Sequence, residues 1–171
     1  SVNEFCTVTA WLPATTGLEG VPALGLLAHL DTAPAFSGKD VNPIVHQRYD
    51  GGDIVLPKEG RVIRVADFPW LSRLKGKTVI TADGSTLLGA DDKAGIAEIM
   101  TLCERLIAEG IPHGRLCVAF TPDEEIGEGP DHFDVAAFGA KYAYTVDGSA
   151  AGSIEYENFN AASAKVDITG V

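Results

Sequence analysis

Hydrophobic positions along the chain occur in short runs that predict β-strands. Residues 5–12 alternate between apolar and polar side chains, as in a strand with one exposed face. Residues 23–30 and 115–121 are almost wholly apolar, which is typical of strands buried on both faces of a sheet. Residues 142–146 predict a further strand, and it runs directly into Asp147.

A helical pattern of apolar residues lies between these strands. In residues 93–109 the apolar side chains recur at helical spacing, while charged side chains occupy the opposite face. Gly110 and Pro112 end this pattern. Residues 133–138 predict a second, shorter helix. Because strands alternate with helices, the sequence predicts an α/β domain with a mostly parallel central sheet flanked by helices.

The segment of residues 32–83 breaks this alternation. It is rich in Gly, Pro, Asp and Asn, and it predicts only short strands near residues 53–56, 61–65 and 78–81. An excursion of this length inside a compact domain is usually functional or a decorated insertion.

Both ends of the sequence indicate part of a longer protein. Residues 1–4 lack an initiator Met and lead directly into a strand-like run. Residues 164–171 alternate as a strand does, yet no cap or partner strand follows them. We therefore expect a domain that is truncated at both ends.

Composition excludes several classes of partner. A hydrophobic content of 46% supports a packed core, and a net charge of −11 argues against binding to nucleic acid or to an anionic membrane. No apolar run reaches transmembrane length, so we expect a cytoplasmic protein. Cys6, Cys103 and Cys117 are odd in number and form no C-x-x-C pair, which predicts buried, unpaired thiols in a reducing compartment.

Four groups of polar residues, each after an apolar run, form the candidate site. They are His29 with Asp31, Asp91 with Asp92, Glu124 with Glu125 after Asp123, and Asp147. Because α/β sheets bind ligands at the carboxyl ends of their strands, these side chains can meet. Each group alone also has an ordinary interpretation: a core histidine, a helix N-cap, a solvated turn or an Asp-Gly turn. Together, their order favours a two-metal hydrolase centre.

The residue types suit that chemistry. A carboxylate at Asp31 can fix the tautomer of His29 and make it a better metal ligand. Adjacent acids can bridge two cations, and adjacent glutamates can supply one ligand and one general base. Histidine with carboxylates suits zinc, cobalt or manganese. The serines lack a nucleophile elbow, no cysteine lies in an electropositive setting, and the remaining histidines (His46, His113 and His132) are interpreted as surface or satisfied residues in loops.

These residues resemble the zinc aminopeptidases of the M20 family, and within it the tripeptide aminopeptidases. The resemblance covers essentially the whole chain through residues 29–32, 36–39, 41–43, 51–54, 87–95, 119–125, 144–148 and 157–162. The long segment between His29 and Asp91 distinguishes the tripeptide enzymes from the shorter dipeptidases, deacetylases and carboxypeptidases of the family.

The resemblance implies a role for each residue of the site. His29 and Asp147 are expected to bind one zinc, Asp91 to bridge to a second zinc that Glu125 binds, Glu124 to be the general base, and Asp31 to orient His29. It also implies a cis peptide bond between Asp91 and Asp92. The expected cofactors are two Zn²⁺ ions per complete subunit, with Co²⁺ or Mn²⁺ as possible replacements, and the expected substrates are short peptides.

One part of the family pattern is absent. The family takes a further histidine ligand for the second zinc from a region after an inserted lid domain. We expect residues 1–160 to form part of the catalytic domain and residues 161–171 to begin that lid, through which the parent protein would form a homodimer. We therefore expect this chain to have weak activity or none. The alternatives are another M20 hydrolase, such as a dipeptidase or an N-acyl amino acid deacylase, or a non-catalytic metal-binding domain.

Overall fold

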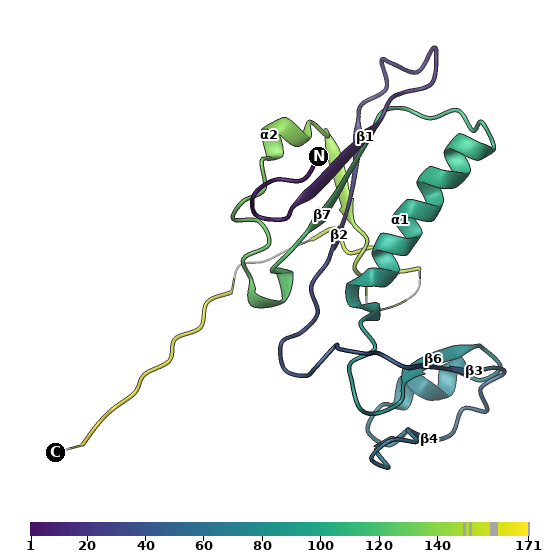
Figure 1. Cartoon of the computed structure of the whole chain (residues 1–171), viewed down its shortest axis with the longest axis vertical. Coiled ribbons are helices and arrows are strands. Elements are labelled where there is room, and N and C mark those ends of the chain that lie inside the picture. The colour runs from purple at the N-terminus through teal and green to yellow at the C-terminus, as the bar shows by residue number, and fades with distance from the viewer. Residues whose placement is uncertain (149, 151, 158–160, 171) are drawn as a thin grey trace.

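The predicted strands assemble into one four-stranded sheet in a computed structural model, which describes residues 1–148, 150, 152–157 and 161–170. The strand order is β1 (Val8–Leu12), β7 (Leu116–Thr121), β2 (Leu24–His29) and β8 (Tyr142–Thr145). β2 is parallel to both of its neighbours, whereas β1 is antiparallel to β7. The expected α/β fold with a mostly parallel central sheet is therefore confirmed (Figure 1).

The register of the parallel strands brings their carboxyl ends to one edge. β2 pairs with β7 from Leu24↔Leu116 to His29↔Thr121, and with β8 as far as Leu27↔Thr145. The amide of Val146 then donates to the carbonyl of Leu27 at 2.8 Å. The polar groups of the candidate site follow these strands in the sequence, so they emerge at a common edge.

Helix α1 (Ala90–Ala108) covers one face of the sheet. Its Ile99 side chain is only 2% exposed and packs in a cluster with Leu26, Ala28, Val118 and Phe120 from β2 and β7. The predicted helix is confirmed: the backbone angles of Asp91 and Asp92 are not helical, so the regular helix begins after them, close to the predicted residue 93. The first turn contains the Asp91–Asp92 peptide bond, which is cis as the resemblance implied.

The other face of the sheet packs against α2 (Val135–Phe138) and the segment before it. Phe138 is buried against Cys117 and Ala119, which alternate along β7 with the residues that face α1. Asp134 caps α2 by accepting a hydrogen bond from the amide of Ala137 at 2.9 Å. The two helices thus lie on opposite sides of the sheet, as Figure 1 shows.

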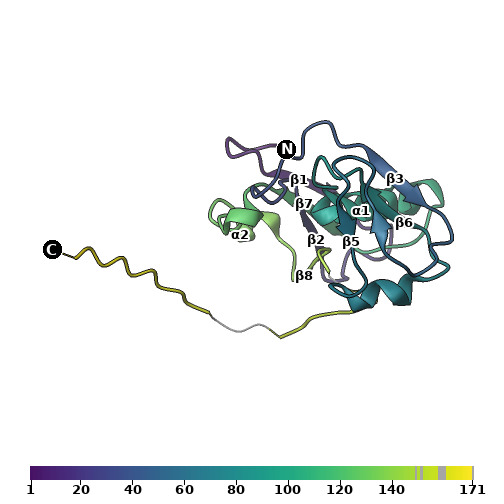
Figure 2. The same ribbon diagram turned by 90° about the horizontal axis from the view of Figure 1, so that it is seen from below.

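The long excursion forms a small subdomain with its own core. β3 (Pro43–His46) pairs with β6 (Val79–Ala82), and β4 (Ile54–Val55) pairs with β5 (Val62–Ile63). A 3₁₀ helix, η1 (Pro69–Leu74), completes it, and Tyr49, Ile54 and Leu71 are buried together. The subdomain lies beyond the N-terminal end of α1 (Figures 1 and 2). The three predicted short strands are confirmed in approximate position, whereas β3 and η1 were not predicted.

Two local predictions are wrong. Residues 5–7 do not belong to the first strand: Cys6 adopts a positive φ of 65° in a turn and is exposed, whereas Cys117 is buried and Cys103 is half-buried. All three thiols are unpaired, as expected. Residues 164–170 are not a strand, because they extend away from the body and meet no partner strand among the described residues (Figure 2).

Residues 158–160 of the 157–162 motif, and residue 171 of the predicted terminal strand, lie outside the described residues. In the part of the chain that the structure describes, no helix combines the length and the apolar character needed to cross a membrane.

Candidate metal centre

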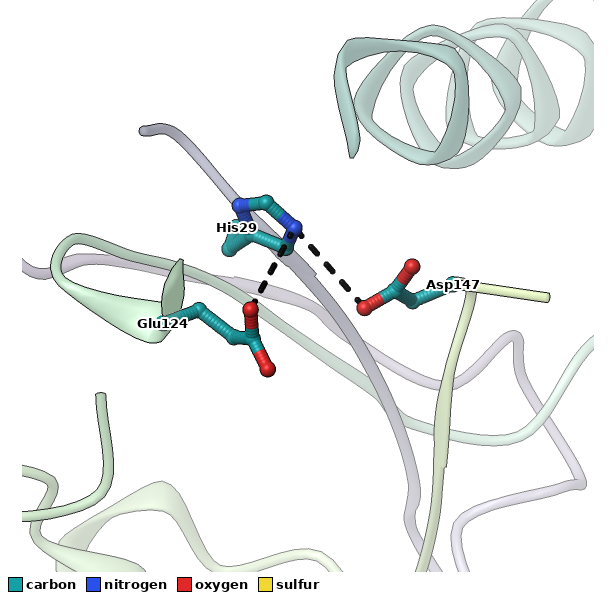
Figure 3. Close-up of side chains that lie close together, drawn as sticks. All are labelled: His29, Glu124 and Asp147. Atoms are coloured by element: carbon teal, nitrogen blue, oxygen red, sulfur yellow. Dashed lines mark ion pairs between the residues drawn. The ribbon is translucent and has the colours of Figure 1, made fainter. Parts of the chain in front are cut away.

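The candidate residues meet at the carboxyl edge of the parallel strands. His29 ends β2, and Asp147 follows β8. Glu124 and Glu125 lie in a short 3₁₀ turn after β7, η2 (Glu124–Ile126), and Asp91 lies in the first turn of α1. The structure thus brings together all the predicted metal ligands with Glu124 and Asp31, and Figure 3 shows His29 between Glu124 and Asp147.

The Nε2 atom of His29 is the centre of this cluster. It lies 2.9 Å from Asp91 Oδ1, 3.8 Å from Glu124 Oε2 and 3.8 Å from Asp147 Oδ2. The His29 side chain is 3% exposed, whereas the side chains of Asp91 and Glu124 are 70% and 53% exposed. A buried nitrogen donor therefore faces carboxylates that remain open to solvent. A cavity of about 390 Å³ adjoins His29, Glu124 and Asp147.

These donor atoms fit the requirements of divalent cations. His29 forms one group with Glu124 and Asp147 and another with Asp91 and Glu125, and the donor atoms of each group lie within 4.8 Å of one another. Tetrahedral zinc with bonds near 2.1 Å separates its donor atoms by about 3.4 Å, so small side-chain movements bring either group to bonding geometry. Nitrogen and carboxylate donors suit zinc, cobalt or manganese.

The charge of the cluster also favours a cation. Five carboxylates lie near the ring of His29, from Asp31, Asp91, Glu124, Glu125 and Asp147. The nearby ammonium group of Lys93 donates instead to the carbonyl oxygen of Leu30 at 3.0 Å. Because like charges at this density repel one another, divalent cations would relieve the repulsion.

The orientation of His29 is fixed through its other ring nitrogen. Nδ1 lies 3.0 Å from the backbone carbonyl oxygen of Asp31 and 3.4 Å from its carboxylate Oδ1. Since a carbonyl can only accept, Nδ1 donates to it, and Nε2 faces the acids. Burial lowers the pKa of His29, but the hydrogen bond to Asp91 and the charges of Asp147 and Asp31 outweigh it and raise the pKa overall.

Asp31 also contacts the glutamate pair. Its Oδ1 accepts a hydrogen bond from the amide of Glu124 at 3.2 Å, and its Oδ2 accepts one from the amide of Glu125 at 3.0 Å. Burial raises the pKa of the Asp31 carboxyl, but these two hydrogen bonds, together with one from its own amide and the interaction with His29, outweigh burial and lower the pKa. The sequence alone predicts a link from Asp31 to His29 but none to the glutamates.

Asp92 has a structural function that the sequence analysis did not assign. The residue is 3% exposed, and its Oδ2 accepts a hydrogen bond from the backbone amide of His29 at 3.1 Å. Burial raises its pKa, because it disfavours the charged carboxylate. Asp91 thus faces the site, whereas Asp92 ties the first turn of α1 to the end of β2. In the sequence, the apolar residues beside this acid pair were the signal that could have indicated a buried acid.

Gly95 allows α1 to approach the strand that carries Asp147. A Cβ atom at this position would overlap the carbonyl oxygen of Val146 and the carboxylate of Asp92. We expect Gly95→Ala to lower the free energy of unfolding by about 2 kcal/mol, because the overlap outweighs the helical preference for Ala. Chemical denaturation measures this change.

The matched control is Ala97→Gly, at an exposed position of the same helix, which should cost about 1 kcal/mol through helix propensity alone. An unchanged or higher stability of Gly95→Ala would contradict the close approach of α1 to Val146.

The other three histidines lie in ordinary structural settings. His46, in β3, is hydrogen-bonded to Thr81 Oγ1 at 3.0 Å. His113 bonds to the carbonyl of Gly114, and the ring of His132 stacks on Phe5 with centroids 3.6 Å apart. Their interpretation as surface or satisfied residues is confirmed, although His46 belongs to a strand rather than a loop.

Comparison with known proteins supplies independent information. No protein-family profile matches the chain. It is 59% identical to Peptidase T of Geobacillus thermodenitrificans, 61% identical to that of Geobacillus kaustophilus and 55% identical to that of Salmonella enteritidis, each over 99% of this chain. The chain spans 41–42% of the length of these relatives.

Solved structures with the same fold agree with this result. Aminopeptidase PepT from Bacillus cereus matches with a TM-score of 0.61 and 28% identity, over 84% of this chain and 30% of that one. A tripeptidase from Staphylococcus aureus matches with a TM-score of 0.58 and 27% identity, also over 84% of this chain and 30% of that one. An aminoacylhistidine dipeptidase from Vibrio alginolyticus shares the fold, with a TM-score of 0.58 and 22% identity, over 89% of this chain and 26% of the dipeptidase chain. Along 99% of its length, the chain is therefore similar, at 55–61% identity, to a segment of curated proteins named Peptidase T.

Proposed function

We propose that the protein is a two-metal aminopeptidase that releases the N-terminal residue from tripeptides. The observation that carries this proposal is the convergence of one buried histidine, His29, with separate acidic groups at the ends of three parallel strands and of α1. The names of the relatives and of the Staphylococcus aureus tripeptidase support the choice of substrate.

The donor atoms suggest how the ions are shared. We assign His29 and Asp147 to one ion, Glu125 to the other, and Asp91 to a bridge between them, with zinc as the expected metal and cobalt or manganese as alternatives. When bound, such ions polarise the scissile carbonyl group and lower the pKa of water. Asp31, through its backbone and side chain, holds the His29 ring in place.

Glu124 is proposed as the general base. Its side chain is 53% exposed, lines the cavity beside His29, and is free to face a bound peptide. In this role its carboxylate takes a proton from the attacking water and delivers that proton to the leaving amine. Neighbouring glutamates on one turn thus divide the two tasks, because Glu125 is assigned to the metal.

The isolated chain is proposed to have little activity. Among the described residues, the two candidate groups of donors share His29, so a second ion would be held by the carboxylates of Asp91 and Glu125 alone. Such an ion would bind weakly, since carboxylates of this exposure are well solvated without it. The relatives are more than twice as long as the chain, and their additional length can supply further ligands.

Three further expectations from the sequence stay predictions. The division into a catalytic part (residues 1–160) and the start of a lid (residues 161–171) is one of them, and a homodimer through that lid is another. The third is a cytoplasmic location, which the three unpaired thiols support.

A substrate panel tests the proposal in a chimera. In this chimera, the chain replaces the matching segment of the Geobacillus kaustophilus relative, with which it is 61% identical. We expect hydrolysis of tripeptides with a free amine and none of their N-acetylated forms. Hydrolysis of N-acyl amino acids but not of tripeptides would instead indicate a deacylase. A folded, metal-loaded chimera that hydrolyses nothing would indicate a non-catalytic domain.

A further inference from the structure

The turn that carries both glutamates is short and poorly buried. η2 has only three residues, none of them buried, and it lies between Asp123 and Gly127, which both have positive φ angles, of 63° and 80°. Two backbone hydrogen bonds close the turn, from the amide of Gly127 to the carbonyl of Glu124 at 2.8 Å and from the amide of Glu128 to the carbonyl of Asp123 at 2.9 Å. So small a turn needs outside support if it is to hold two functional side chains in fixed places.

The turn also lacks a cap of its own. The first amides of a helical turn have no partner within it, and a side chain just before the turn usually accepts from them. Asp123 holds that position in η2 but makes no such hydrogen bond.

The carboxylate of Asp31 supplies the missing cap from a distant part of the chain. Its two oxygens accept from the amides of Glu124 and Glu125, which lie 93 and 94 residues further along the chain, at 3.2 and 3.0 Å. A carboxylate presents two acceptors to two donors, and its charge strengthens both hydrogen bonds. Asp31 is 23% exposed, so solvent competes only partly for these bonds.

Asp31 is itself held in a rigid frame. The preceding residue, Leu30, donates its amide to the carbonyl of Thr121 at 2.8 Å and accepts from Lys93 Nζ at 3.0 Å. Asp31 is thus fixed relative to β2, β7 and α1 before its carboxylate reaches η2.

We propose that the Asp31 carboxylate is a positioning residue for the Glu124–Glu125 turn. Orientation of His29 is then chiefly the task of the Asp31 backbone carbonyl, which is nearer to Nδ1 (3.0 Å) than the carboxylate is (3.4 Å). Asp31 therefore positions two parts of the site: its backbone carbonyl orients His29, and its carboxylate holds the glutamate turn. This inference goes beyond the proposed function, because it concerns the metal-free chain and holds whatever the substrate is.

Asp31→Asn tests the proposal, because the amide side chain keeps the shape of the carboxylate and the backbone carbonyl but loses the charge and one acceptor. In the metal-free chain, we expect the amide protons of Glu124 and Glu125 to exchange with solvent at least about tenfold faster. The Nδ1–H group of His29 should keep its hydrogen bond to the backbone carbonyl of residue 31, as the ¹H and ¹⁵N signals of Nδ1 report.

Asp53→Asn is the matched control. Asp53 also accepts a backbone hydrogen bond from a distant residue, Val65, at 2.8 Å, but it lies in the small subdomain. Exchange at Glu124 and Glu125 should stay at the rate of the unsubstituted chain. Equal rates in a folded Asp31→Asn chain would overturn the proposal.

A second measurement needs no substitution, and it decides the matter if Asp31→Asn fails to fold. In the unsubstituted, isotope-labelled chain, scalar couplings across the hydrogen bonds should link the amide nitrogens of Glu124 and Glu125 to the carboxyl carbon of Asp31. Absence of both couplings would overturn the proposal.

Activity of the chimera gives the functional consequence, which rests on the proposed function. We expect Asp31→Asn to lower kcat about tenfold or more, with KM changed by less than about twofold, because a displaced general base affects the reaction more than substrate binding. An unchanged kcat in a chimera that hydrolyses tripeptides would show that Asp31 does not position Glu124. A chimera that lacks activity before substitution contradicts the proposed function, whereas the exchange measurement on Asp31 still stands.

Discussion

His29→Gln is expected to lower the zinc affinity of the chain by more than about 100-fold. Nε2 of His29 belongs to both candidate groups of metal donors, so no group keeps a nitrogen ligand when it is lost. Groups that merely support a ligand contribute about 10–100-fold to metal affinity, and loss of the ligand itself should exceed 100-fold. Competition with a chromophoric zinc chelator, together with the metal content of the purified chain, measures the effect.

The substitution should leave the fold in place. The hydrogen bond from residue 29 to Asp92 comes from the backbone amide, which every side chain retains. The matched control is His46→Gln, because His46 is hydrogen-bonded to Thr81 in the small subdomain, away from the candidate site. We expect zinc affinity of the control to equal that of the unsubstituted chain. If His29→Gln binds zinc within about threefold of the unsubstituted chain, His29 is not a ligand.

The second large effect is expected from Glu124→Gln in the chimera. Glutamine is close to glutamate in shape but cannot accept the proton, so kcat should fall by about 10²–10⁴-fold while the metal content is retained. Activity assays and metal analysis of the same preparation give both quantities.

Glu125→Gln is the matched comparison, because Glu125 is the residue after Glu124 in the same turn. Glu125 is grouped with His29 and Asp91 as a possible ligand, so we expect its substitution to release metal as well as to lower activity. The geometry makes this test necessary, since Glu124 also forms a possible ligand group, with His29 and Asp147. If Glu124→Gln loses metal and Glu125→Gln retains it, Glu124 is the metal ligand and Glu125 is the general base.

The sheet and the edge that carries the candidate site could be predicted from the sequence because their signals are local. Residues 23–30 and 115–121 are continuous apolar runs, and only central strands of a sheet covered on both faces bury such runs fully. His29 lies at the end of the first run and the glutamates follow shortly after the second, so the order of the chain alone placed them at one edge.

Small elements of the insertion could not be predicted in this way. The side chains of β3 alternate between exposed and half-buried, so its apolar pattern is weak. η1 begins at Pro69 and contributes one buried residue, Leu71, to a core whose other buried members, Tyr49 and Ile54, lie in earlier parts of the insertion. Cys6 adopts a positive φ angle that an alternating pattern does not reveal.

Contacts between distant polar groups were equally out of reach. The link from Asp31 to Glu124 and Glu125 spans more than 90 residues, and it follows from the register of β2 with β7. The inward position of Asp92 likewise depends on how α1 packs against β2. Periodicity identifies which residues are buried, but tertiary packing decides which oxygen meets which amide.

Anomalous diffraction from crystals of the chain soaked with zinc tests the central claim most directly. We predict a zinc peak within bonding distance, about 2.1 Å, of His29 Nε2, with carboxylate oxygens of Asp147 and Asp91 among its ligands. A weaker second peak is expected between Asp91 and Glu125. If zinc at saturating concentration leaves His29 without a peak beside Nε2, the carboxyl edge of this sheet is not a metal centre and the hydrolase assignment fails.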